Sequence, residues 1–113
     1  MLPNNNRLTK EKDFAKIKES GNSFFSALFR VKILKNKLKD SRFAVIIPNK
    51  VSKKAVERNR LKRQIREILR LNLDKFKLSF DVVLWVNNKA LNKTYQEIEK
   101  EVLKVLTKAK LIK

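Results

Sequence analysis

The sequence predicts an α/β fold, a small two-layer sandwich in which helices cover a short sheet, and two patterns carry that prediction. Residues 23–34 alternate with the two-residue period of a strand, and two apolar runs, 43–47 and 82–86, have strand length. Three other segments repeat apolar side chains at the spacing of a helix. The length of 113 residues fits one domain, so residues 1–113 are expected to form a single unit.

The first helix is expected over about residues 10–20. Thr9 can act as its N-cap, and Gly21, the only glycine of the chain, follows it and suits the helix end. The alternating run 23–34 comes next, as a strand that is bent or split near Ala27. Followed as one continuous strand, its outer face carries Phe24, Arg30 and Lys32.

The middle of the chain adds a strand and a second helix. A turn over residues 36–40 leads to a strand at 42–47, which Pro48 ends or makes an edge strand. The second helix is expected from residue 53 to about residue 71. Its apolar stripe consists of Leu61, Ile65, Ile68 and Leu69.

The last third of the chain predicts a buried strand and a third helix. After a loop, residues 81–86 read as the strand, and Thr94 with Glu97 forms a capping box that starts the helix. The expected order is therefore α-β-β-α-β-α, with one further strand if the run near Ala27 is split.

The charge of the chain predicts a polyanionic partner. Lys and Arg number 29 against 11 Asp and Glu, a formal net charge of +18, so RNA, DNA and anionic membrane are the candidates. Cys and His are absent, which removes disulfides, thiolate chemistry and the usual general base. No apolar run is long enough to span a bilayer, and no secretory signal is visible, so a soluble cytoplasmic protein is expected.

The helix expected over residues 53–71 is the main candidate binding surface. At about 100° per residue, its apolar stripe points one way and a broad cationic face points the other. Arginine forks match phosphate oxygens bidentately, whereas a solvated helix face is the alternative interpretation. The excess charge of the whole chain favours nucleic-acid binding. The candidate residues are Lys53, Lys54, Arg58, Asn59, Arg60, Lys62, Arg63, Arg66 and Arg70.

A second candidate surface combines aromatic and basic residues on the outer strand face. Bases of unpaired strands stack on aromatic rings while cations follow the backbone. Phe24, Arg30 and Lys32 share the predicted face, and Phe14 of the first helix can approach it. The alternative is that Phe14 and Phe24 belong to the core. Trp85, inside an apolar run, is predicted to be a core residue.

No group of residues predicts catalysis by the polypeptide. Glu97, Glu99 and Glu101 are spaced by two on a predicted helix, so their carboxylates diverge around it. A single glycine cannot make a glycine-rich phosphate loop. We therefore expect a binding subunit with no catalytic residue and no metal ligand.

Residues 53–67 (KKAVERNRLKRQIRE) closely resemble the signature of the bacterial ribonuclease P protein subunit. The resemblance covers nearly the whole chain, in order and at the expected length. The further matches are NRLTKEKDFAKI near the start, Gly21, Arg42-Phe43 opening a strand, Asp81-Val82-Val83 and Thr94-Tyr95-Gln96-Glu97.

The resemblance implies a role and a fold. Proteins of this family partner a large catalytic RNA, and the holoenzyme cuts the 5′ leader from precursor tRNA. The RNA is expected to do the chemistry and to hold most of the Mg²⁺, while the protein contacts that RNA and the leader. The implied fold is like domain 2 of ribosomal protein S5, α-β-β-β-α-β-α, with a left-handed βαβ crossover where the general rule favours a right-handed one.

The same resemblance assigns contact with the RNA subunit to the basic helix, and it implies a separate leader cleft. Lys18 and Lys32 stand where the family often has aromatic residues, and Asn87-Asn88 replaces an arginine-bearing loop. The basic helix therefore matches the family more closely than the leader cleft does. The leader-binding candidates are Phe14, Lys18, Phe24, Arg30, Lys32 and Lys50.

Other binding roles remain as alternatives. A ribosomal or other structural RNA-binding protein without an enzymatic role shares the charge and the fold class. A DNA-binding regulator that uses residues 53–71 as its recognition helix would need another helix just before them. The preceding residues, 42–47, are instead predicted to form a strand. A membrane-surface role is disfavoured, because the apolar face of the basic helix is needed to form the protein core. The expected partners are therefore the RNA subunit and precursor tRNA, without DNA or membrane.

Overall fold

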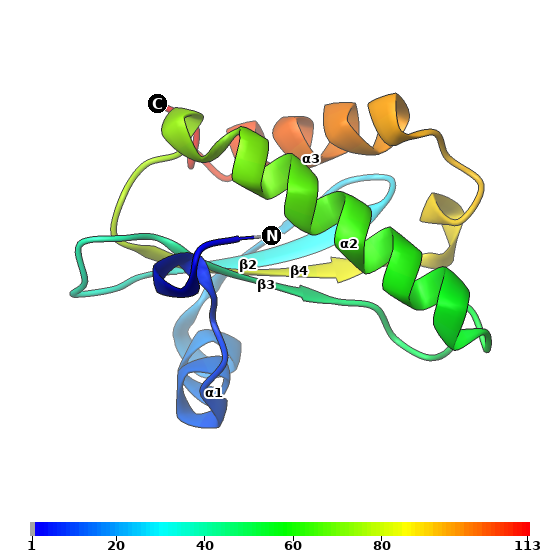
Figure 1. Cartoon of the computed structure of the whole chain (residues 1–113). Coiled ribbons are helices and arrows are strands. Elements are labelled where there is room, and N and C mark those ends of the chain that lie inside the picture. Colours follow the sequence, from blue (N-terminus) through cyan, green and yellow to red (C-terminus); the bar gives the residue numbers. More distant parts are fainter. Residues whose placement is uncertain (1) are drawn as a thin grey trace.

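The computed structural model describes residues 2–113, which form a four-stranded sheet with three α-helices (Figure 1). The sheet order is β1-β2-β4-β3, with β2 antiparallel to both of its neighbours and β3 parallel to β4. The predicted split of the first strand is confirmed, and the order is α-β-β-β-α-β-α. The elements are α1 (Glu11–Ser20), β1 (Asn22–Phe25), β2 (Phe29–Lys35), β3 (Arg42–Ile46), α2 (Ala55–Leu71), β4 (Phe80–Val86) and α3 (Tyr95–Lys108), with short 3-10 turns at Asn4–Asn6, Leu73–Lys75 and Asn88–Ala90.

The connection from β3 through α2 to β4 has the unusual hand. The two strands are parallel neighbours in the sheet. In the sequence, α2 comes between them, and it packs over one face of the sheet. Viewed from the α2 side with both strands pointing up, β4 lies to the left of β3, so the crossover is left-handed (Figure 1). Nearly all such connections are right-handed. The left-handed crossover was therefore expected only from the family resemblance, and the hydrophobic pattern of the sequence did not predict it.

The two faces of the sheet are covered unequally. α2 and α3 lie over one face, and α1 lies against the other (Figure 1). The predicted stripe of α2 is buried in the larger core, together with the apolar side of α3. On the α1 side, Leu8, Ile17 and Val83 form a small separate cluster. The α1 face is therefore only partly filled, which leaves part of the sheet accessible.

The hairpin between β1 and β2 decides which aromatic side chains face the accessible side. Phe25 pairs with Arg30, and Phe24 pairs with Val31. Directly opposite residues of an antiparallel pair point to the same face, so Phe25 shares the α1 face with Arg30, while Phe24 packs against the larger core. The prediction that Phe24 lies on the outer face was wrong, because the turn at residues 26–28 shifts the alternation between the two strands.

Of the two predicted helix N-caps, the structure confirms one. The capping box of Thr94 and Glu97 is present at the start of α3, as predicted. The predicted Thr9 cap is wrong, because Lys10 occupies the N-cap of α1 and no side chain caps that helix. A Cβ at Gly21 would lie 2.5 Å from the Ile17 carbonyl oxygen, so glycine is required there by close contact.

An ion-pair network ties α1 to the sheet. Arg42 of β3 donates from Nε and Nη2 to the two carboxylate oxygens of Asp81 at 2.8 and 2.7 Å, and from Nη1 to Asp13 of α1 at 3.2 Å. The hydrogen bond to Asp81 is the main cause that raises the pKa of Arg42. Asp81 is only 5% exposed, and Arg42 is its cationic partner. Within residues 2–113, no helix combines the length and the apolar character needed to cross a membrane.

Candidate nucleic-acid interface

The polar face of α2 presents the predicted cations in one continuous surface. Helical periodicity sends the apolar stripe into the core and leaves this face outward. Arg58, Lys62 and Arg66 are half-buried. The remaining predicted residues of this surface are exposed: Lys53, Lys54, Asn59, Arg60, Arg63 and Arg70.

Arg58 serves the local fold as well as the surface. Its Nη1 donates to the backbone carbonyl of Ser52 at 2.6 Å, and the Ser52 hydroxyl donates to Glu57 at 2.5 Å. These contacts fix the segment that leads into α2. Arg58 therefore keeps only part of its donor set for a ligand, whereas Arg60 is exposed and free to turn toward one.

Lys62 and Arg66 stand one helical turn apart and repel each other. Burial, and then the charge of Arg66, lowers the pKa of Lys62. Both side chains line a hollow of about 170 Å³ together with Arg7 of the N-terminal segment and Phe14 of α1. The hollow lies beside β3 and joins the basic helix to the α1 side of the sheet.

The C-terminal end of the basic face is partly neutralised. Arg70 forms an ion pair with Glu67 on the same helix, and its Nε donates to Glu67 Oε2 at 3.2 Å. The pair is exposed, where such contacts contribute little. Arg70 is therefore paired with Glu67 but remains exposed.

A groove lies between α1 and the sheet. It has a volume of about 390 Å³ and is lined by Glu11, Phe14, Ala15, Lys18, Ile46 and Trp85. Phe14 is half-buried, so one part of its ring packs on the sheet while another part is accessible. Phe14 and Lys18, two of the predicted leader-binding residues, thus line the same groove.

Lys32 holds α1 in place. Its Nζ donates to the backbone carbonyl of Lys18 at 2.7 Å, across from β2 to the end of α1. This contact occupies one donor of the ammonium group. The structure thus places Lys32 beside the groove as predicted and adds an anchoring role.

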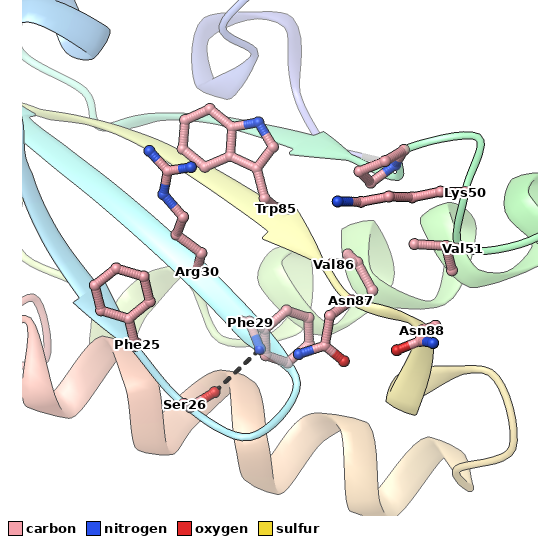
Figure 2. Close-up of a pocket in the computed structure, with 11 residues that line it drawn as sticks. Phe25, Ser26, Phe29, Arg30, Lys50, Val51, Trp85, Val86, Asn87 and Asn88 are labelled. Carbon is pink, nitrogen blue, oxygen red and sulfur yellow. Dashed lines mark hydrogen bonds between the residues drawn. The ribbon is translucent and has the colours of Figure 1, made fainter.

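Beyond the groove, one row of side chains crosses the α1 face. Phe25, Arg30, Trp85 and Ile46 lie opposite or beside one another on β1, β2, β4 and β3. The Cζ atom of Arg30 is 4.9 Å from the centre of the Trp85 ring, a cation–π contact. The row borders a second hollow that also includes Lys50 (Figure 2).

Two predictions about aromatic residues need correction. Phe24, a leader-binding candidate, is half-buried and packs against the larger core, so it lies on the wrong face for that role. Trp85, predicted to be a core residue, is half-buried and lines both the groove and the second hollow. The only indication in the sequence that Phe25 could face the site was the possible bend or split of the strand near Ala27. The sequence contained no such indication for Arg7, which reaches the site through the N-terminal segment.

Across residues 2–113, no cluster of three or more carboxylates is close enough to hold a metal ion. Glu97 belongs to the capping box, and its hydrogen bonds with Thr94 lower its pKa. The surfaces described above suit polyanions because cationic side chains line them.

Comparison with known proteins agrees with this assignment. The model of the family described as Ribonuclease P matches residues 2–110. The "Ribonuclease P protein component" of Pseudanabaena sp. (strain PCC 6903) is 38% identical over 113 residues, which cover 99% of this chain and 97% of that protein. The protein of the same name from Clostridium botulinum (strain Loch Maree / Type A3) is 38% identical over 105 residues, which cover 92% and 94%.

Solved structures show the same fold. The RNase P protein of Staphylococcus aureus superposes with a TM-score of 0.88 at 28% identity, covering 96% of this chain and 98% of that one. The RNase P protein of Thermotoga maritima gives a TM-score of 0.83 at 30% identity, covering 90% and 96%. Each superposition therefore covers at least 90% of this chain.

A basic helix beside a cationic and aromatic sheet face defines a small RNA-binding protein of the α/β class. The family match and the relatives cover almost all of the sequence, so the chain belongs to the ribonuclease P protein family. Its role is that of the protein subunit of ribonuclease P, a tRNA-processing ribonucleoprotein, and it partners an RNA subunit. The alternative of a ribosomal protein does not account for these matches.

Proposed function

We propose that the protein binds the catalytic RNA through α2 and holds the 5′ leader of precursor tRNA in the groove beside α1. The observation that carries this proposal is the hollow that Lys62 and Arg66 of α2 share with Phe14 of α1. Because the two surfaces meet there, an RNA bound on α2 and a leader bound along α1 lie next to each other. The protein can thus position the leader relative to the RNA subunit.

Each surface suits its proposed ligand. The arginine-rich face of α2 matches phosphate oxygens of a folded RNA, since each guanidinium can donate two parallel hydrogen bonds. The groove offers the ring of Phe14 for a base and the ammonium of Lys18 for the backbone. Lys32 supports the groove by anchoring α1. Arg30 and Lys50 extend the cationic path beyond Trp85.

We infer that cleavage chemistry and most of the Mg²⁺ belong to the RNA partner. The donor set of the described residues does not fit a protein-held metal, because it lacks a cluster of carboxylates and the chain lacks His and Cys. The contribution of the polypeptide is electrostatic. Its +18 charge offsets repulsion between two RNA molecules and improves substrate affinity at physiological salt. We expect it to act in the cytoplasm on precursor tRNA.

The test is cleavage of precursor tRNA by the protein reconstituted with its RNA subunit at low Mg²⁺. We expect cleavage at the mature 5′ end by the complex and much slower cleavage by the RNA alone. A variant with Arg60→Ala and Arg66→Ala should lose the stimulation. Leu78→Ala, an exposed change in the loop before β4, should retain it. Full stimulation by the double variant would show that α2 is not the RNA-binding surface.

A further inference from the structure

The hollow at the open end of the α1 face is a site distinct from the leader groove. It has a volume of about 500 Å³, which is within the range of sites that hold small ligands. Phe25, Arg30 and Trp85 stand on one side, and Lys50 and Asn88 stand on the other (Figure 2). It therefore offers a stacking wall opposite a polar wall.

We propose that this hollow binds one unstacked purine base of the leader, separate from the base that stacks on Phe14. The inference rests on the proposed function, because the leader must first occupy the groove beside α1. Trp85 lines both the groove and the hollow, so a single strand that leaves Phe14 can pass directly along the indole into the second site.

The stacking wall is exposed and held in place. Phe25 is 58% exposed, an unusual state for a phenylalanine, and Lys108 of α3 fixes its backbone carbonyl with a hydrogen bond of 3.0 Å. Arg30 lies against the Trp85 ring with its Cζ atom 4.9 Å from the ring centre. Aromatic rings and guanidinium planes are the surfaces on which unpaired bases stack. A purine covers more of this wall than a pyrimidine, because its ring system is larger.

The polar wall can read the edge of the base. Asn87 is committed to the fold, since its Nδ2 donates to the Ala27 carbonyl at 2.7 Å and its Oδ1 accepts from the Lys89 amide at 2.9 Å. The exposed side chain of Asn88, by contrast, has no hydrogen bond to any residue of the described part of the chain. Lys50 is also exposed and can donate to N7, the acceptor that both purines share.

The experiment measures precursor binding by the reconstituted holoenzyme for the wild type and for Phe25→Ala. The leader carries a purine, a pyrimidine or an abasic nucleotide at each position in turn, and mature tRNA is the leader-free reference. Phe25→Ala should weaken precursor binding about five- to tenfold, the lower part of the range for stacking one base on a ring, and leave mature tRNA unchanged. Trp85→Leu is the second variant, with its thermal unfolding measured beside binding. Leu78→Ala removes another exposed apolar side chain and is the matched control.

The decisive result is coupling between one nucleotide and the aromatic wall. At one leader position, a pyrimidine or abasic substitution should weaken wild-type binding and have little effect in Phe25→Ala. That position should differ from the one that couples to Phe14. If Phe25→Ala and a folded Trp85→Leu bind every leader like the wild type while Phe14→Ala does not, the second site is absent and the proposed function stands. If Phe14→Ala also has no effect, the leader lies elsewhere and both proposals fail.

Discussion

The guanidinium of Arg30 lies over the indole ring of Trp85, with 4.9 Å between Cζ and the ring centre. The two residues are directly opposite each other on antiparallel strands β2 and β4. Such a contact contributes about 0.5–1 kcal/mol at an exposed site, and it holds a positive charge at a fixed place on the sheet. A half-exposed aromatic ring and an ordered cation are thereby presented together to the solvent beside the groove of α1.

Replacing Phe14 by alanine tests the leader groove. The variant should lose about 1–3 kcal/mol of affinity for precursor tRNA, because one base loses its stacking partner, and it should bind mature tRNA in the holoenzyme as before. The quantity to measure is the difference between precursor and mature affinity. An unchanged difference in a folded variant would show that Phe14 serves only the small cluster around Ile17.

Arg60 and Arg58 should differ although they are neighbours in sequence. Arg60→Ala should lower the slope of log K against log salt by roughly 1 and change the free energy of unfolding by less than about 0.5 kcal/mol, because the residue is exposed. Arg58→Ala should also destabilise the fold, because the Ser52 carbonyl loses its donor. Urea denaturation and salt-dependent RNA binding separate the two effects. Equal stabilities would contradict the structural role of Arg58.

Lys62→Gln should stabilise the free protein and weaken RNA binding. The substitution removes repulsion with Arg66 at i,i+4 spacing, which is worth about 0.2–0.5 kcal/mol. The pKa of Lys62 is lowered in the folded state, so its charged form is disfavoured by folding. The gain in stability is therefore present at neutral pH and should vanish as the pH rises past 10.5, the ordinary value for lysine. A gain that persists at higher pH would have another cause.

Arg42→Met should be the most damaging change to the fold among these variants. It leaves the buried carboxylate of Asp81 without its cation, which costs about 3–5 kcal/mol. Asp13→Asn is the comparison, because it keeps the pair with Asp81 and loosens only α1. We expect Asp13→Asn to reduce precursor binding more than overall stability, as measured by tRNA affinity and thermal unfolding side by side.

Carboxylate substitutions test where the chemistry occurs. Glu99→Gln, Glu101→Gln and Glu97→Gln should each support cleavage by the reconstituted complex at the wild-type rate, provided that the variant folds and binds the RNA subunit. Single-turnover cleavage at saturating protein is the measurement. Loss of cleavage in one folded, RNA-bound variant would place a catalytic group on the polypeptide.

The sequence by itself determined the features that depend on neighbouring residues. The buried stripe and the basic face of α2 follow from the 3.6-residue period, and the capping box of Thr94 and Glu97 is a contact between residues one turn apart. The charge predicted a polyanionic partner, and the resemblance of residues 53–67 to a known family selected RNA among the candidates. These features could be read from the sequence because their interactions are local.

Tertiary structure alone decided the arrangement of the site. The turn at residues 26–28 placed Phe25 rather than Phe24 on the accessible face. The crossover from β3 to β4 brought Lys62 and Arg66 to the same hollow as Phe14, about half the chain away in sequence. Strand alternation has a period of two, so a single shift in a turn exchanges the faces of a strand. Contacts between distant elements depend on how the whole chain packs, and no local pattern records them.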